Sequence, residues 1–449
     1  MQINLNDDEI HTLPDIFRLR VLASPDEVAY LHYDAGGQEW HTNTWREMER
    51  EVTRWQQAML QEELEPGDRV GIMLKNCREW VVFDQAALAL GLVVVPLYPE
   101  DRPDSVAYIV RHANLKLLVV EGKRQWQRLQ SVSEELEGLQ RIVTLNNVDH
   151  DDGSTDPRLE SLSEWIFGCH GDMVQVEVEA DSLATIVYTS GTTGRPKGVM
   201  LSHKNIISNL KHVGDYIEFR PGDRFLSFLP LSHMLERTGG YLLPMYKGSQ
   251  VAYSRSIQQL GSDLQEMQPT LLISVPRIYE QVYGRIMDAL KKQPEFRQKL
   301  FHKAVDVGWH NFEYRQGRAR WEPKLLLWPI LRKLVASKVL ARLGGRLRYA
   351  VCGGAPLPPG VAKVFVGLGL DVLHGYGMTE TSPVVAVNRP EDNIPASIGQ
   401  KLSNLEVEIG NNDELLVRGD SVMMGYWKNE EATRSTIDED GWLALIGDA

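Results

Sequence analysis

The chain has 449 residues, which is enough for about two to four domains. Hydrophobic residues make up 43% of it and charged residues 24%, and these values exclude a disordered or fibrous chain. The net charge of −13 gives the molecule as a whole no attraction to phosphate backbones, so we expect no nucleic-acid partner.

The first part of the chain alternates helical and strand-like segments. A helical pattern runs from Thr44 to Glu62, and β-branched runs cover Gly91 to Leu97 and Leu115 to Glu121. This rhythm predicts an α/β fold with a parallel sheet flanked by helices. The acidic opening MQINLNDDEI is unlike a secretory signal, and the apolar stretch from Val81 to Tyr98 is interrupted by polar and turn residues, so we expect no membrane span.

The middle part repeats the α/β rhythm, and the last part changes character. Further buried strands are predicted at four places, Leu183 to Tyr188, Arg224 to Leu229, Thr270 to Val275 and Leu347 to Cys352. From Ile398 onward the strands are short, and those at Leu405 to Ile409 and Leu415 to Arg418 flank a turn, which predicts a hairpin. Turn-rich segments at Asn146 to Asp156 and Pro390 to Pro395 are candidate boundaries. We expect α/β subdomains at 1–180 and 181–396 and a small β subdomain at 397–449.

The stretch from Arg315 to Arg348 is strongly basic and contains one acid, Glu322. Apolar residues, among them Trp321 and Trp328, lie between its basic residues. Such a basic amphipathic segment could rest on an anionic membrane surface, or it could be a solvated helix face packed on the core. The sequence leaves both interpretations open, and it leaves the oligomeric state open as well.

The segment from Tyr188 to Gly198, YTSGTTGRPKG, has the composition of a phosphate-binding loop and follows a buried strand. Its glycines let backbone amides approach an anion, its hydroxyls add donors, and Lys197 adds a positive charge. It is not the common P-loop, because Pro196 stands where that pattern needs a glycine directly before the lysine. The loop therefore predicts a phosphate site of another kind.

This loop resembles the phosphate-binding signature of adenylate-forming enzymes, a superfamily that includes acyl-CoA synthetases, peptide-synthetase adenylation domains and luciferases. Further segments resemble the motifs of this family and occur in its order: 228–237 (FLPLSHMLER), 353–356 (GGAP), 375–380 (GYGMTE), 414–419 (ELLVRG) and 425–427 (GYW). The sequence SVPRIYE at 274–280 and the long insertion after it are most similar to the long-chain fatty acyl-CoA synthetase branch. The resemblance implies a large N-terminal α/β domain of that type.

The resemblance also implies a role for each motif residue. Lys197, Thr379 and the loop would hold the ATP phosphates, Glu380 and Thr189 would ligate Mg²⁺, and Tyr376 would stack on adenine. The full implied nucleotide site comprises Thr189, Ser190, Gly191, Thr192, Thr193, Gly194, Lys197, Gly353, Gly354, Ala355, His374, Gly375, Tyr376, Gly377, Thr379 and Asp448. Lys197, His233, Thr379 and Glu380 would be the catalytic residues.

A fatty acid is the implied second substrate. The residues expected to contact it are His233, Met234, Arg237, Gly239 and Gly354, and the small Gly239 and Gly240 could leave room for an alkyl chain. Because a carboxylate is already ionised at neutral pH, positioning is the expected role of His233, not proton transfer. His203 follows the phosphate loop, but its presence is explained equally well by the start of a helix whose N-cap is Ser202.

The cysteines suit a structural role in a reducing compartment. Cys77, Cys169 and Cys352 are odd in number and have spacings that fit neither a disulfide framework nor a zinc cluster, so we expect a cytoplasmic protein with packed cysteines. Cys352 adjoins Gly353, but the sequence places no base beside it that would make it an acyl carrier.

The end of the chain departs from the family pattern. GWLALIGDA resembles a ribose-binding motif, but Ile446 replaces its threonine and one extra residue separates Trp442 from Gly447, which puts the role of Asp448 in doubt. The C-terminal lid domain of the family is expected to be absent. The hypotheses are therefore the N-terminal part of an AMP-forming long-chain fatty acid–CoA ligase that uses ATP, Mg²⁺ and CoA, an acyl-AMP ligase that loads a carrier protein, or a non-catalytic acyl-nucleotide binding module.

Overall fold

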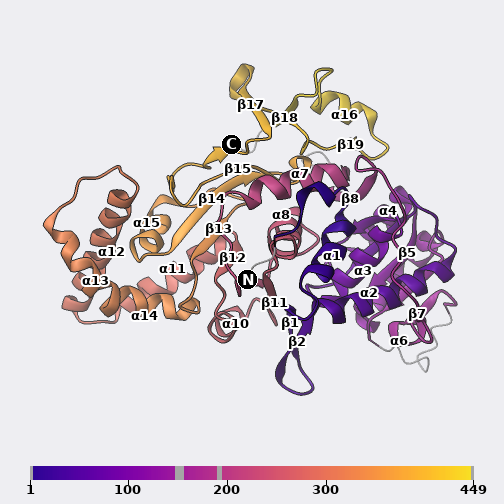
Figure 1. The fold of residues 1–449 in the computed structure, drawn as a ribbon, viewed down its shortest axis with the longest axis horizontal. Helices are drawn as coiled ribbons and strands as arrows, with labels where there is room; N and C mark the ends of the chain where they lie inside the picture. The colour runs from indigo at the N-terminus through magenta and orange to yellow at the C-terminus, as the bar shows by residue number, and fades with distance from the viewer. Residues whose placement is uncertain (1–3, 147–155, 190–194, 446–449) are drawn as a thin grey trace.

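A computed structural model of the protein describes residues 4–146, 156–189 and 195–445. It has two large mixed sheets with helices around them and a small antiparallel sheet, so the predicted α/β class is confirmed. In Figure 1 the indigo and purple helices α1 to α4 lie on one side, and the orange helices α11 to α15 lie on the other. The yellow C-terminal strands lie along the upper edge.

The first sheet has eight strands in the order β19-β9-β8-β4-β3-β5-β6-β7. The neighbours from β8 to β7 pair in parallel, whereas β9 and β19 extend the sheet in antiparallel fashion. The strands are β3 (Arg69–Met73), β4 (Val93–Pro96), β5 (Leu115–Val120), β6 (Arg141–Thr144), β7 (Leu159–Ser161), β8 (Leu183–Thr189), β9 (Lys197–Ser202) and β19 (Gly425–Tyr426).

The second sheet has nine strands in the order β16-β15-β14-β13-β12-β10-β11-β1-β2. Its central strands are parallel, and antiparallel strands close both edges. The strands are β1 (Val28–Asp34), β2 (Glu39–Thr44), β10 (Arg224–Ser227), β11 (Gln250–Tyr253), β12 (Leu271–Ser274), β13 (Tyr349–Cys352), β14 (Asp371–Gly377), β15 (Val384–Val387) and β16 (Gln400–Lys401).

The small sheet contains the predicted C-terminal hairpin. β17 (Leu405–Ile409) pairs antiparallel with β18 (Leu415–Gly419), and β20 (Leu443–Leu445) pairs with β18. Sheet membership crosses residue 180 in both directions, because β1 and β2 join the second sheet while β8 and β9 join the first. The boundaries at 180 and 396 remain predictions about folding units, and most of the turn-rich segment at 146–156 lies outside the described residues.

Helices cover the sheets and connect their strands. The α-helices are α1 (Leu13–Ala23), α2 (Trp45–Met59), α3 (Arg78–Ala89), α4 (Pro103–Ala113), α5 (Lys123–Leu129), α6 (Leu162–Trp165), α7 (His203–Gly214), α8 (Met234–Glu236), α9 (Leu243–Lys247), α10 (Leu260–Met267), α11 (Pro276–Lys291), α12 (Glu295–Arg315), α13 (Trp328–Leu331), α14 (Ser337–Leu340), α15 (Pro359–Gly367) and α16 (Glu430–Thr436). The shorter 3-10 helices are η1 (Asp7–Glu9), η2 (Leu60–Glu62), η3 (Gln130–Leu136), η6 (Pro323–Leu327), η8 (Ala341–Leu343), η9 (Thr379–Thr381) and η10 (Asn411–Asp413), and the π-helices are η5 (Arg237–Leu242) and η7 (Arg332–Ala336).

Helix starts follow local sequence signals. The side chain of Thr44 accepts a hydrogen bond from the Glu47 amide and Glu47 bonds back to the Thr44 amide, a capping box that begins α2. Ser202 begins α7 in the same way, with the Asn205 amide as its donor. The prediction that Ser202 caps a helix starting at His203 is confirmed.

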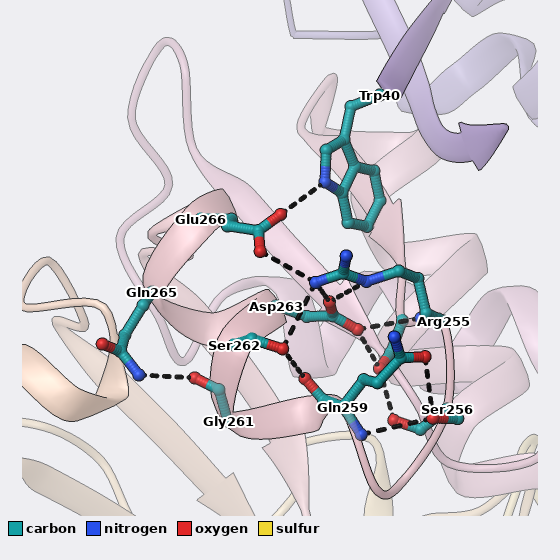
Figure 2. A network of polar contacts seen from close by, with 10 residues as sticks. Trp40, Arg255, Ser256, Gln259, Gly261, Ser262, Asp263, Gln265 and Glu266 are labelled. Atoms are coloured by element: carbon teal, nitrogen blue, oxygen red, sulfur yellow. Dashed lines mark hydrogen bonds and ion pairs between the residues drawn. The ribbon is translucent and has the colours of Figure 1, made fainter. Parts of the chain in front are cut away.

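A polar cluster on α10 and the loop that follows β11 holds the β1–β2 hairpin at the edge of the second sheet (Figure 2). The Arg255 guanidinium donates to Asp263 and, at 2.8 Å, to Glu266. Glu266 in turn accepts from the Trp40 indole at 2.9 Å. Because Arg255 also lies 4.7 Å from the Tyr33 ring centroid, one side chain holds both strands of the hairpin.

A fully buried ion pair joins the two large sheets. Arg237 of η5 and Asp84 of α3 both have no exposed side-chain surface, and the Arg237 guanidinium donates to the Asp84 carboxylate. Arg237 also donates to the Thr185 hydroxyl at 2.7 Å, and Asp84 accepts from the Tyr241 hydroxyl at 3.0 Å. Burying two charges costs free energy, and the attraction between them offsets this cost only when additional hydrogen bonds such as these are present.

Candidate active site

The two ends of the predicted phosphate loop are brought together by antiparallel pairing. β8 ends at Thr189 and β9 begins at Lys197, and these two residues are paired across the strands. At Gly198 a side chain would meet Ile186 at 2.7 Å, so glycine is needed for this close packing. Ser190, Gly191, Thr192, Thr193 and Gly194 lie outside the described residues, so the structure describes only the frame of the loop.

Tyr426 lies between the predicted phosphate lysine and the predicted metal carboxylate. The Lys197 ammonium lies 5.0 Å from the centroid of the Tyr426 ring, and the Tyr426 hydroxyl donates to Glu380 Oε1 at 2.9 Å. Burial and the neighbouring Glu380 carboxylate raise the pKa of Tyr426, so its hydroxyl keeps its proton and remains a donor. The structure thus brings Lys197 and Glu380 together through a side chain to which the sequence assigned no role.

β19 carries Tyr426 to this position. It pairs antiparallel with β9, which places Tyr426 opposite Val199. The Tyr426 amide donates to the Thr433 hydroxyl at 2.9 Å, and the Trp427 indole donates to the His112 carbonyl at 3.0 Å. The GYW motif was a visible signal for these residues, but nothing in it predicted pairing with the strand that begins at Lys197.

Tyr188 and Arg195 flank the loop and contact α4. The Tyr188 hydroxyl and His112 Nδ1 are 2.8 Å apart, and the Arg195 guanidinium lies 5.4 Å from the centroid of the Tyr108 ring. Tyr108 and His112 stack on each other with ring centroids 5.1 Å apart. α4 therefore supports both ends of the loop, which was not predicted from the sequence.

Asn209 of α7 forms hydrogen bonds with the turn that carries Thr379 and Glu380. The Asn209 amide donates to the carbonyls of Thr381 and Val384 at 3.2 and 2.7 Å, and its oxygen accepts from the Val384 amide. Thr379 and Glu380 are each 7% exposed, so their position is set by packing. Such support orients a carboxylate before any ligand arrives.

A pocket lies beside this turn and is lined by the predicted nucleotide motifs. Its walls include Gly353 and Gly354 after β13, Gly375, Tyr376 and Gly377 of β14, and His233. His374 is buried, and its Nε2 lies 3.2 Å from the Ala355 carbonyl oxygen, so it braces the glycine segment and does not line the pocket. Three motifs that are distant in sequence therefore share one pocket.

An apolar cavity lies next to this pocket. The two share four lining side chains, Leu235, Val351, Val384 and Val387. The remaining walls of the cavity are almost entirely apolar and come from α7 and the segment after it, η5, α9, β10 and β12: Val213, Tyr216, Ile217, Phe219, Phe225, Thr238, Gly239, Leu243, Leu271, Leu272 and Ile273. The nucleotide motifs therefore line a space that lies directly beside an apolar cavity, an arrangement that suits an acid with an apolar tail.

The residues predicted to contact the fatty acid are distributed unevenly around these two spaces. His233 and Gly354 line the pocket of the nucleotide motifs, and Gly239 lines the apolar cavity. Met234 is fully buried, and Arg237 belongs to the buried ion pair with Asp84, so neither lines the pocket or the cavity. Partial burial lowers the pKa of His233, so its imidazole is neutral at neutral pH, and its Nδ1 accepts from the Leu235 amide at 3.2 Å.

Glu380 is the residue that could hold Mg²⁺. Among the described residues no group of three histidine, cysteine, aspartate or glutamate side chains is arranged to hold a metal ion. A single carboxylate fits Mg²⁺ nonetheless, because this ion usually takes one or two carboxylates and completes its shell with substrate phosphates and water. Asp448, the doubtful ribose ligand, lies outside the described residues.

The cysteines are free thiols. Cys169 and Cys352 are buried, and burial raises the pKa of the Cys352 thiol to about 12. A thiol with so high a pKa is a poor nucleophile at neutral pH, so the structural role expected for Cys352 is consistent with its surroundings.

Known proteins match most of the length of this chain. The family described as "AMP-binding enzyme" matches residues 17–427. The chain is 33% identical over 398 residues to Long chain acyl-CoA synthetase 7, peroxisomal, of Arabidopsis thaliana, covering 84% of this chain and 55% of the relative. It is 30% identical over 446 residues to Long-chain-fatty-acid--CoA ligase FadD15 of Mycobacterium bovis, covering 94% of this chain and 72% of that protein. A plant Long-chain-fatty-acid--[acyl-carrier-protein] ligase, AEE15 of Arabidopsis thaliana, is 27% identical over 98% of this chain and 67% of that protein.

Solved structures share the fold at low sequence identity. An anthranilate CoA ligase, AuaEII, in complex with anthranoyl-AMP has a TM-score of 0.76 at 19% identity, covering 98% of this chain and 76% of that chain. The N-terminal domain of FACL13 from Mycobacterium tuberculosis has a TM-score of 0.70 at 20% identity, covering 97% of this chain and 95% of that domain. The chain thus spans about half the length of the plant synthetase and nearly all of a solved N-terminal domain. The family match over residues 17–427 shows that the chain belongs to the AMP-binding enzyme family.

Proposed function

We propose that the chain is the ATP- and acyl-binding part of an AMP-forming long-chain fatty acid–CoA ligase. The observation that carries the proposal is the adjacency of two spaces, a pocket lined by the nucleotide motifs and an apolar cavity whose wall shares Leu235, Val351, Val384 and Val387 with it. A fatty acid needs such a pair of environments, because its carboxylate must meet the nucleotide while its alkyl chain leaves water.

In the proposed reaction a carboxylate oxygen attacks the α-phosphorus of ATP, and the bond from that phosphorus to pyrophosphate breaks. The protein aligns the two groups and neutralises the negative charge on the phosphates. Lys197 would pair with the phosphates together with Thr189, Thr379 and the loop 190–194. Glu380 would hold Mg²⁺, which supplies positive charge beside the leaving pyrophosphate.

The remaining motif residues would orient the nucleotide and the acid. Tyr376 would stack on adenine, with Gly353 and Gly354 forming the wall beside the adenylate, as expected from their position around one pocket. His233 stands at the same pocket in its neutral form and would position the carboxylate by a hydrogen bond. No general base is needed for the nucleophile, because a fatty acid is ionised at neutral pH.

Acyl-adenylate formation is the step that tests this proposal. The chain is incubated with Mg²⁺, ATP and fatty acids of graded length, and pyrophosphate release is measured beside calorimetric binding of a non-hydrolysable acyl-adenylate analogue. We expect binding that tightens with chain length and pyrophosphate release that depends on the fatty acid. Binding without release even after the C-terminal domain of the family is supplied would favour the non-catalytic module, and no binding of the analogue would contradict the proposal.

A carrier protein is the second candidate acceptor, favoured by the similarity to the plant ligase named for an acyl carrier protein. The two acceptors are separated by supplying CoA or acyl carrier protein after adenylate formation and measuring thioester product. We propose CoA, because most of the synthetases cited above carry it in their names. Free thiols in all three cysteines also fit the proposed cytoplasmic location.

A further inference from the structure

Five large apolar side chains are exposed in the insertion between β12 and β13, four of them on one helical run and Trp321 two residues before that run. We call this group the outer face, and it consists of Trp321, Leu326, Leu327, Ile330 and Leu334, which are 53%, 69%, 39%, 58% and 50% exposed. The run passes from η6 through α13 and η7 without interruption. In Figure 1, α13 lies at the end of the molecule opposite α4 to α6.

The outer face is not needed to hold the helical run in place. Leu325, Leu331 and Ala336 point inward and are buried, and Leu331 packs with Ala304 and Val307 of α12. The exposed Leu326, Ile330 and Leu334 follow one another at intervals of four residues and therefore share the opposite side of the run. The segment has an apolar side for the core and a second apolar side without a partner among the described residues.

Basic side chains surround the outer face. Arg332, Lys333, Lys338 and Arg342 are exposed, and none of them makes an ion pair within the part of the chain that the structure describes. From 320 to 348 the sequence has eight lysines and arginines and one acid, Glu322, in a chain with a net charge of −13. The remainder of the surface is therefore strongly negative, and this end is a local exception.

We propose that the outer face docks on the surface of a bilayer that contains anionic lipid. The apolar side chains would enter the boundary between headgroups and acyl chains while the surrounding cations pair with lipid phosphates, which is the binding mode of interfacial amphipathic helices. The segment lies on the bilayer and does not cross it, and no helix in the described ranges is long and apolar enough to span a membrane.

The chemistry of the outer face favours lipid over a protein partner. The cores of protein interfaces are depleted in lysine, whereas here lysine and arginine alternate with the apolar residues along the run. The negative charge of the rest of the chain would repel an anionic bilayer, so this end alone is attracted and the docking has one orientation. This inference is independent of the proposed ligase activity.

Vesicle sedimentation tests the proposal on the whole chain. Vesicles of phosphatidylcholine alone are compared with vesicles that also contain phosphatidylglycerol, at low and high salt. We expect sedimentation with the anionic vesicles only, and release at high salt because the attraction is screened. Failure of the unaltered chain to sediment with anionic vesicles would overturn the proposal, whatever the result for pyrophosphate release.

Two double variants locate the contact. L326S/I330S removes two apolar side chains from the outer face and is expected to lower the partition coefficient at least about tenfold. K333E/K338E reverses two charges and is expected to lower it by a similar factor or more, at about fivefold for each basic charge lost. Phe167→Ser, at a side chain 86% exposed elsewhere, and R50E/R124E are the matched controls and should sediment like the unaltered chain.

Circular dichroism and mass measurement complete the design. All variants should keep the spectrum of the unaltered chain, because every changed side chain is exposed. Equal loss of sedimentation in the control variants would show a general charge effect and overturn the assignment of the face. A dimer that L326S/I330S converts to a monomer, with unchanged vesicle binding, would show an interface between two copies instead.

Discussion

The Tyr426 hydroxyl donates a hydrogen bond to Glu380 Oε1 at 2.9 Å, while the ring of the same tyrosine lies 5.0 Å from the Lys197 ammonium. One side chain thus connects the carboxylate proposed for Mg²⁺ with the cation proposed for the phosphates. Since β19 carries Tyr426 and pairs with β9, the C-terminal strands contribute directly to a site whose other parts lie in the two large sheets.

Replacing Tyr426 by phenylalanine keeps the aromatic ring next to the Lys197 ammonium and removes the hydrogen bond to Glu380. A hydrogen bond to a charged group contributes about 1.5–3 kcal/mol, so we expect the Mg²⁺ concentration for half-maximal ATP binding to rise about tenfold or more. Calorimetric titration of ATP at several Mg²⁺ concentrations measures this. Tyr246→Phe, which removes a hydroxyl bond to Asp7 outside the site, is the control, and equal effects in both variants would contradict the positioning role.

Lys197→Ala and Glu380→Gln separate binding chemistry from folding. Lys197 is partly exposed at the start of β9, so its truncation removes a charge for the phosphates and little packing. Glu380→Gln keeps an oxygen that can accept from Tyr426. We expect ATP affinity and pyrophosphate release to fall at least tenfold in both variants, while their melting temperatures stay within a few degrees of that of the unaltered chain. The control is Lys204→Ala, which breaks an exposed ion pair with Asp420. A parallel loss of stability and activity would contradict the assigned roles.

Strand positions could be predicted from local patterns, but sheet membership could not. The apolar runs at 115–121 and 183–188 match β5 and β8 to within one residue at each end, because buried strands have a strong local signature. That β1 pairs with β11, more than two hundred residues later, depends on long-range packing such as the Arg255 contacts to Tyr33 and Glu266. No local pattern encodes such a pairing.

In the candidate site, too, residues in local motifs could be predicted from the sequence and residues that act through long-range contacts could not. The composition of the loop pointed to Lys197, and the resemblance to adenylate-forming enzymes pointed to Glu380 and the residues around Tyr376. The supporting residues Asn209, His112 and Tyr426 were not assigned roles, since each acts through a contact with a distant segment. Arg237 follows His233 by four residues, yet its charge is paired with Asp84 of α3.

Narrowing the apolar cavity should change the preference for chain length. A Cβ at Gly239 would meet the Ile273 side chain at 3.2 Å, at the wall of the cavity, so Gly239→Val reduces the space for an alkyl chain. We expect pyrophosphate release with long fatty acids to fall at least tenfold while release with short ones is retained. Gly261→Val, where no atom lies within 4 Å of the added Cβ, is the control. A uniform loss at all lengths would show that Gly239 has a structural role only.

His203 makes the stability of the fold depend on pH. It is 2% exposed, its Nδ1 accepts from the Leu13 amide at 3.1 Å, and burial lowers its pKa to about 4. The unfolded chain takes up this proton near pH 6.5 and the folded chain only near pH 4, so the stability contributed by the neutral ring is complete above pH 6.5 and is lost as the pH falls toward 4. The expected loss is about 1.4 kcal/mol per pH unit in this interval.

His203→Gln removes the titrating group and keeps an oxygen that can accept from the Leu13 amide. Urea unfolding between pH 8 and pH 4.5 should therefore show a constant difference between the variant and the unaltered chain above pH 6.5, and a progressive relative gain for the variant below it. The difference isolates His203 from other buried groups, such as Glu236, whose pKa burial raises to about 8 and whose contribution is common to both proteins. The exposed His170→Gln variant should follow the unaltered chain at every pH. Parallel stability curves for His203→Gln and the unaltered chain would show that the neutral, buried imidazole is not the source of acid sensitivity.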